Sequence, residues 1–170
     1  MDVYEAIRSR RSIRAYDSAR PVPEDVLRRV LDAARLAPSA RNRQEWRFIV
    51  VRDAEKRERL VKAAKGQNFV GQAPVVLAFC ATEDKDVMSC GQKPGPIDTS
   101  IALAYLTLAA AAEGLGTCWL GAFYEDQVKQ ILGVPAAARV IAMTPLGWPA
   151  EKPAARERKA FEEVVGFEKW

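Results

Sequence analysis

The sequence contains no histidine, and its three cysteines, Cys80, Cys90 and Cys118, are scattered and form no CxxC pair. The lack of histidine excludes Ser-His-Asp and Cys-His nucleophilic catalysis and imidazole general bases, and it removes most zinc and non-haem iron sites. Three scattered cysteines do not indicate a disulfide framework. The chemistry of this chain must therefore depend on other side chains, on the backbone or on an organic cofactor.

Long apolar runs and a large excess of charge are also lacking. No apolar run reaches the roughly 20 residues of a membrane span, and the most apolar stretch, residues 101–112, predicts a buried helix. Asp2 and Glu5 make the N-terminus unlike a secretory signal, so we expect a cytoplasmic protein with no membrane partner. The net charge of +4 suits an anionic ligand but is too small for a nucleic-acid binder.

Helical and strand patterns are mixed along the 170 residues, with no internal repeat and no linker. Apolar spacing predicts helices over residues 24–36, about 53–65, 98–113 and 125–132. We expect Asp53 to cap the second of these helices, and Asp98 or Thr99 to cap the third. Apolar and β-branched residues predict strands over residues 47–51, 73–81 and 139–146, and a short strand or extended turn over 118–123. This mixture predicts one α+β domain with a small central sheet.

Two basic segments are suited to binding an anion. In the segment 10–14, RRSIR, guanidinium groups at alternate positions of an extended chain point to one side, where they can pair with phosphate. Arg156 and Arg158 follow the last predicted strand. Either segment alone is also typical of a solvated basic surface.

Two further segments are suited to a planar ligand. The loop 37–46, APSARNRQEW, combines small residues with the amides and hydroxyl of Ser39, Asn42 and Gln44, although ordinary helix-to-strand loops have similar compositions. The segment 114–123, GLGTCWLGAF, has glycines that permit close backbone approach. The end of a helix explains its first two glycines but leaves Gly121 unexplained.

Taken together and in this order, the four segments resemble the nitroreductase family of FMN-dependent oxidoreductases, from Tyr4 to Trp170. The resemblance implies a nitroreductase-like fold with a central, mostly antiparallel sheet flanked by helices. It also implies an intertwined homodimer with two flavin sites at the interface. Residues 1–170 then form a single FMN-binding domain, whose exchanged C-terminal tail, residues 160–170, packs on the partner subunit.

The resemblance also implies which residues contact FMN. The N-terminal motif for the phosphate, ribityl chain and pyrimidine edge matches Arg10, Arg11, Ser12 and Arg14. The loop from the other subunit matches Pro38, Ser39, Ala40, Asn42 and Gln44. The amide beside the flavin matches Gln67, the segment along the ring matches Trp119, Leu120, Gly121 and Ala122, and the phosphate-binding basic pair matches Arg156 and Arg158. One departure is Glu45, which stands where the family commonly has proline.

The activity implied by the resemblance is electron transfer from NADH or NADPH, through flavin N5, to a nitroaromatic, quinone or similar small-molecule acceptor, with ping-pong kinetics. No side chain is an obligatory acid or base and no metal is involved; the Gly121 backbone and Arg14 give electrostatic support. Two alternatives remain open. One is a specialised flavoenzyme of the same fold, a dehalogenase or a flavin-cleaving enzyme, and the other is a flavin-binding redox sensor without turnover.

Overall fold

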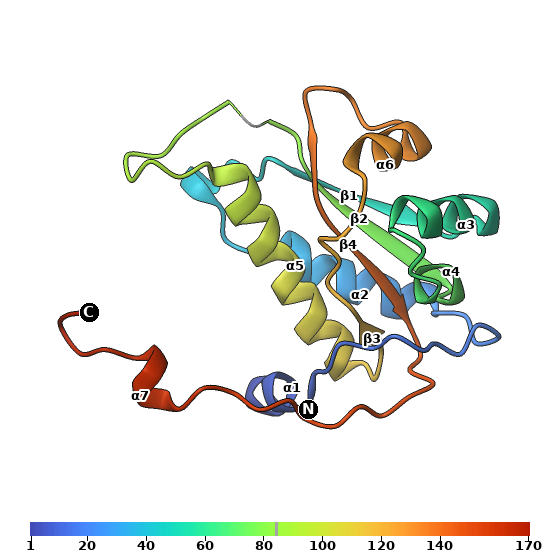
Figure 1. The fold of residues 1–170 in the computed structure, drawn as a ribbon, viewed down its shortest axis with the longest axis horizontal. Coiled ribbons are helices and arrows are strands. Elements are labelled where there is room, and N and C mark those ends of the chain that lie inside the picture. Colours follow the sequence, from blue (N-terminus) through green and yellow to red (C-terminus); the bar gives the residue numbers. More distant parts are fainter. Residues whose placement is uncertain (84) are drawn as a thin grey trace.

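The computed structural model describes residues 1–83 and 85–170, and it has three layers, with a sheet between two groups of helices (Figure 1). The described strands are β1 (Trp46–Val51), β2 (Val75–Ala81), β3 (Gly116–Thr117) and β4 (Arg139–Gly147). They lie in the order β1-β2-β4-β3, and each neighbouring pair is antiparallel. The predicted α+β fold with a mostly antiparallel sheet is confirmed.

Strand β2 lies in the middle of the sheet and is buried along its whole length. Successive side chains of a strand point to opposite faces, so Leu77 and Phe79 pack into one core and Val76 and Ala78 into the other. Both faces of the sheet are therefore covered, as the nearly continuous apolar run of this strand predicts.

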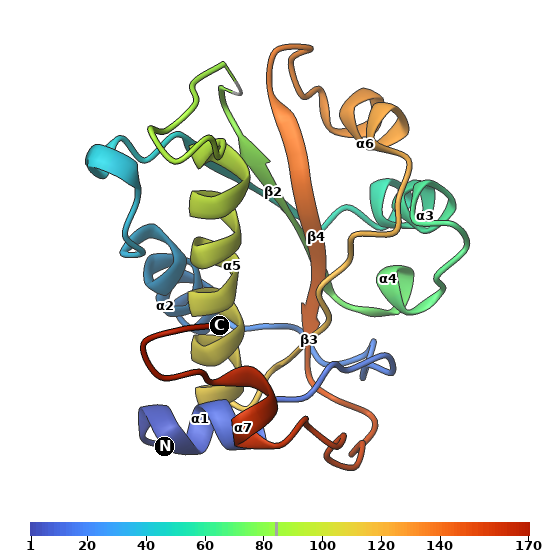
Figure 2. The same ribbon diagram turned by 60° about the vertical axis from the view of Figure 1, so that its left-hand side comes forward.

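Helices α2 (Glu24–Arg35) and α5 (Pro94–Ala112) cover the first face of the sheet (Figure 2). Val30 of α2 and Leu103 and Leu106 of α5 are completely buried there. By length and composition alone α5 could cross a membrane, with a mean hydropathy of 1.2. Its apolar face instead packs on the sheet, as expected for the core helix of a three-layer domain.

The second face carries α3 (Ala54–Ala63), α4 (Phe69–Gln72) and α6 (Glu125–Leu132). The Asp53 side chain caps α3 by accepting a hydrogen bond of 2.8 Å from the Lys56 N–H, as predicted. Helix α6 ends at Gly133, whose φ of 67° is in the left-handed region that glycine adopts readily.

One prediction from the sequence is wrong. Helix α5 begins at Pro94, which is tolerated because the first N–H groups of a helix need no intrahelical acceptor. Asp98 and Thr99 therefore lie inside the helix and do not cap it. Of the two alternatives for the segment 118–123, the structure has no strand there: Leu120 forms a single bridge with Met143, and the short strand β3 lies just before the segment.

The two ends of the chain lie on the same side of the domain. Helix α1 (Val3–Ser9) is beside the C-terminal part of α5, and the tail with α7 (Phe161–Val164) runs past it and away from the body (Figures 1 and 2). Large apolar side chains of the tail are exposed in the protomer: Phe161, Val164, Phe167 and Trp170.

We expect the substitution Gly116→Ala to destabilise the fold, because a Cβ at residue 116 would lie 2.7–3.0 Å from side-chain atoms of Ile13. Overpacking of this kind typically lowers the free energy of unfolding by about 1–3 kcal/mol, which urea denaturation measures. Gly121→Ala is the matched control, since no atom lies within 4 Å of its Cβ position. Equal stability of the two variants would contradict the close packing of Ile13 on β3.

Candidate functional site

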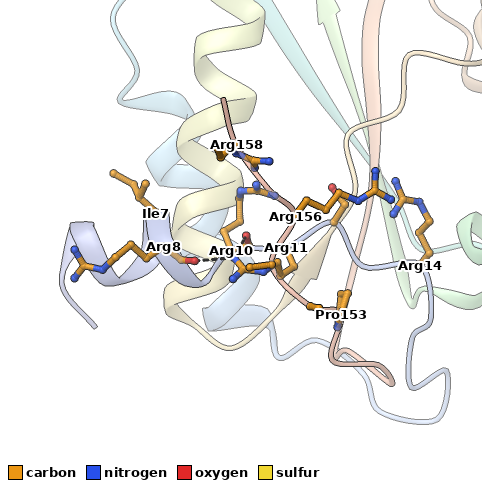
Figure 3. A pocket seen from close by; sticks show the side chains of 11 residues that line it. Ile7, Arg8, Arg10, Arg11, Arg14, Pro153, Arg156 and Arg158 are labelled. Atoms are coloured by element: carbon orange, nitrogen blue, oxygen red, sulfur yellow. Dashed lines mark hydrogen bonds between the residues drawn. The ribbon is translucent and has the colours of Figure 1, made fainter. Parts of the chain in front are cut away.

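A cavity of about 400 Å³ lies between the N-terminal segment and the C-terminal tail, and guanidinium groups dominate its lining (Figure 3). It is lined by Ile7, Arg8, Arg10, Arg11, Ser12, Arg14, Pro153, Ala154, Ala155, Arg156 and Arg158. The structure thus brings together the two basic segments that the sequence analysis selected separately. Arg8 is an additional member that the resemblance did not assign.

The positive charge of this cavity is not neutralised within the protomer. Among the described residues, none of its arginines forms a salt bridge with an aspartate or glutamate. Arg11 instead donates to the carbonyl oxygens of Arg8, at 2.6 Å, and Arg10, at 2.9 Å. The Arg156 side chain extends toward that of Arg14 (Figure 3). Because like charges this close repel each other, an anion with several oxygens, such as a phosphate, would be stabilised here.

Glu151 joins the two segments that form the cavity. Its carboxylate accepts hydrogen bonds from the N–H groups of Arg14 and Ala15, the latter at 3.1 Å. The Ala150 N–H donates to the Ala15 carbonyl at 2.9 Å. The sequence analysis missed Glu151, because residues 136 positions apart carry no local sign of their contact.

The segment 10–14 is also bound to the sheet. The Ile13 N–H donates to the Thr117 carbonyl of β3 at 2.9 Å, and the Tyr16 hydroxyl donates to the Ile13 carbonyl at 2.8 Å. Burial raises the pKa of Tyr16, so this hydroxyl stays protonated and keeps donating. Burial also raises the pKa of Cys118, although the nearby Arg14 acts in the opposite direction. The raised pKa keeps the thiol neutral and a poor nucleophile.

The segment 119–122 continues from β3 and exposes its backbone. Leu120 is anchored to Met143 by two backbone hydrogen bonds of 2.8 and 3.1 Å, whereas Trp119 is 44% exposed. Gly121 has open space at its Cβ position, and its N–H has no hydrogen-bond acceptor among the described residues. The Gln67 amide nitrogen donates to the Ala122 carbonyl at 3.1 Å. Gln67 and this segment therefore lie together.

The loop before β1 lies elsewhere in the protomer. The Ala40 N–H, in the short 3₁₀ turn η1 (Ala40–Asn42), donates a hydrogen bond to Asp98 near the start of α5. Near the end of α5, Ala111 lines a second cavity together with Arg10 and Arg11. With a rise of about 1.5 Å per residue, these two parts of α5 are about 20 Å apart. Within one protomer the loop therefore does not reach the arginine cavity. The loop residues that the resemblance assigns to FMN contact are Pro38, Ser39, Ala40, Asn42 and Gln44.

The backbone of this loop is strained. Arg41, Asn42 and Gln44 have φ values of 54–55°, in the left-handed region that asparagine tolerates but that is unfavourable for arginine and glutamine. The Gln44 N–H donates to the Ser39 hydroxyl at 3.1 Å. Arg43 pairs with Glu45 at 3.5 Å, so a cation faces the carboxylate that replaces the usual proline. Strain of this kind persists only where the surrounding structure holds it, and it is concentrated at functional sites.

The donors present suit a phosphorylated planar ligand. Among the described residues, the guanidinium groups of the cavity have no acidic partner, which suits a phosphate, and the open space and unbonded N–H at Gly121 suit the edge of a ring. The described residues include no group of His, Cys, Asp and Glu side chains that could hold a metal ion.

Known proteins resemble this chain in sequence and fold. The family model described as "Nitroreductase family" matches residues 7–95 and 66–148. The NADH dehydrogenase of Thermus thermophilus is 37% identical, over 97% of this chain and 95% of its own length. The FMN reductase (NAD(P)H) of Bacillus subtilis is 32% identical, over 95% of this chain and 72% of its own length.

A solved structure extends the similarity to the whole fold. A nitroreductase family protein from Clostridium difficile 630 superposes with a TM-score of 0.88 at 30% sequence identity, and the match covers 100% of both chains. The family model spans more than half of this chain, and its similarity to these relatives runs through both basic segments. The chain belongs to the nitroreductase family.

Proposed function

We propose that this protein is an FMN-dependent oxidoreductase that takes electrons from NADH or NADPH and passes them to a small organic acceptor, such as a quinone or a nitroaromatic compound. Membership of the nitroreductase family supports the flavin and the nicotinamide donor. The observation that carries the proposal is the cluster of arginines without acidic partners, since a phosphate is the group that such a cluster binds best.

Most of the residues that would hold FMN lie in two regions of one protomer. Arg10, Arg11, Arg14, Arg156 and Arg158 surround the place for the phosphate, and Ser12 adds a hydroxyl. Gln67 and the segment 119–122 form the place for the ring. The loop residues Pro38, Ser39, Ala40, Asn42 and Gln44 would come from the second subunit of a homodimer.

The protein's contribution to the reaction is binding, orientation and charge, because bound FMN itself supplies the electron-transfer chemistry. The free Gly121 N–H offers a hydrogen bond at the ring edge, and the charge of Arg14 favours an electron-rich ring. Donor and acceptor would use the same open face beside Trp119 in turn, which gives ping-pong kinetics. No side chain has to act as an acid or base, in agreement with a chain that lacks histidine.

Exposed apolar side chains support the homodimer. Val3, Tyr4 and Ile7 of α1 and Tyr105 of α5 are exposed in the protomer, and α1 lies beside α5 where the tail runs past (Figures 1 and 2). Apolar surface gathered in this way is typical of a protein interface. We propose that residues 160–170 pack on the partner subunit, which would cover their own apolar side chains.

The function is tested by anaerobic reduction of the purified protein. We expect a yellow protein that releases FMN on denaturation, is bleached by NADH or NADPH, and is reoxidised by a quinone or nitroaromatic compound with parallel double-reciprocal plots. Bound FMN that neither donor reduces would identify a redox sensor instead. Reduction without turnover of these acceptors would indicate a specialised enzyme, and failure to take up FMN would refute the proposal.

Phosphate recognition is tested with Arg156→Ala and two flavins. Loss of a charge-assisted hydrogen bond of about 1.5–3 kcal/mol should raise the Kd for FMN about 10- to 100-fold. Riboflavin lacks the phosphate, so its Kd should not change; fluorescence titration measures both. Arg35→Ala is the control, because Arg35 pairs with Asp32 on α2 and does not line the cavity. Equal weakening of both flavins would show that Arg156 does not bind the phosphate.

The exchanged tail is tested by deleting residues 160–170, which leaves Arg156 and Arg158 in place. We expect light scattering to show monomers at micromolar concentrations, together with weaker FMN binding, because the partner's loop is lost. Lys169→Ala is the control for a change in the tail that removes no apolar surface. A stable dimer that binds FMN normally after the deletion would contradict the packing of the tail.

A further inference from the structure

The burial of Asp98 is not explained by its position in helix α5. It is the one charged side chain among the described residues that is buried, with 7% of its surface exposed. It does not cap α5, which begins four residues earlier, at Pro94. Burying a carboxylate is costly unless hydrogen bonds compensate, so its presence in the core calls for a specific partner.

That partner is the strained loop before β1. Oδ2 of Asp98 accepts a hydrogen bond of 3.0 Å from the Ala40 N–H, across 58 residues of sequence. A charged acceptor makes such a bond about twice as strong as a neutral one. The adjacent Thr99 is completely buried, and its hydroxyl has no hydrogen-bond partner among the described residues. Of these two neighbours, Asp98 therefore makes the contact with the loop.

The loop needs an external anchor. Arg41 and Gln44 hold left-handed backbone angles that are unfavourable for their types, and Asn42 between them has a left-handed angle that asparagine tolerates. The bonds from Gln44 to Ser39 and Asn42 are internal to the loop. Arg43 pairs with Glu45 and with the exposed Asp86 on the surface. Asp98 is therefore the buried side chain that connects the loop to the core helix.

We propose that Asp98 is a positioning residue, which holds the 39–44 loop in its strained, ligand-ready conformation through the Ala40 N–H. The contact between this loop and the FMN of the partner subunit rests on the proposed function. The anchoring of the loop does not rest on it and is measured separately.

The first measurement is limited trypsin digestion of the full-length protein, both as purified and after removal of bound flavin. Trypsin cuts after Arg41 and Arg43, so mass spectrometry of the first fragments reports opening of the loop itself. We expect Asp98→Ala to speed these cuts about 10-fold, because the open population grows when the anchor is lost. Asp98→Asn retains an oxygen acceptor and should stay within about threefold of the native rate.

Thr99→Val is the matched control. It changes a buried side chain next to Asp98 but removes a hydroxyl that has no partner, so the loop cuts and FMN binding should not change. If Asp98→Ala acts through general destabilisation, cuts throughout the chain would accelerate together. Faster cutting confined to Arg41 and Arg43 supports the anchor.

The second measurement is the Kd for FMN of Asp98→Ala, Ala40→Pro and the double variant. Proline at residue 40 removes the N–H donor, and it is sterically acceptable after Ser39, which is extended with ψ of 156°. We expect each single variant to raise the Kd about 10-fold and the second substitution to add little. If Asp98→Ala does not fold, Ala40→Pro alone deletes the same bond in an exposed loop and gives the answer.

The outcomes separate the two proposals. If Asp98→Ala is cut by trypsin at the native rate and binds FMN with native affinity, the proposed role of Asp98 is overturned. If Asp98→Ala does not fold, the same result for Ala40→Pro overturns it. Faster loop cuts with unchanged FMN affinity also overturn it, since the loop would then be anchored without serving the flavin. A wild-type protein that binds no FMN refutes the proposed function, while the trypsin result still decides the anchor.

Discussion

Burial of β2 on both faces is the constraint on which the rest of this molecule depends. Because each of its seven residues is buried, helices must cover the sheet on both sides, and α5 and α3 supply the largest parts of the two cores. Polar and charged groups are thereby displaced to the ends and edges of the layers. The ligand-binding groups accordingly lie outside the sheet core, on segments that its strands and helices hold in place.

The arginine cavity and the strained loop show two ways of holding such groups. The cavity is held from outside, by Glu151, which binds the backbone of the N-terminal segment to the tail. The loop is held from inside, by a buried carboxylate on α5. In both cases a carboxylate accepts hydrogen bonds from backbone N–H groups, and among the described residues Glu151 forms no salt bridge with an arginine of the cavity. The positive charge of the cavity is therefore kept for an anionic ligand.

Sequence patterns predicted most of the fold because its main elements are long and regular. The spacing of Leu27 and Val30 and the unbroken apolar run of β2 are local signals that identify element type directly. The start of α5 was predicted wrongly, because Asp98 is a good capping residue type and the pattern contains no sign of its distant partner Ala40. Over 118–123 the sequence left a short strand and an extended turn as alternatives, and only the structure shows that Leu120 alone pairs there, with Met143.

By itself the sequence determined the element types, the central buried strand, the lack of histidine chemistry and the residues of the two basic segments, since these depend on composition and short-range spacing. Only the tertiary structure decided that the basic segments form one cavity and that Glu151 and Asp98 hold the cavity and the loop. It also decided that the 39–44 loop contacts α5 near Asp98, about 20 Å along the helix from Ala111, which lies beside Arg10 and Arg11. Such contacts join residues dozens of positions apart. They arise from how the layers pack, which no local pattern records.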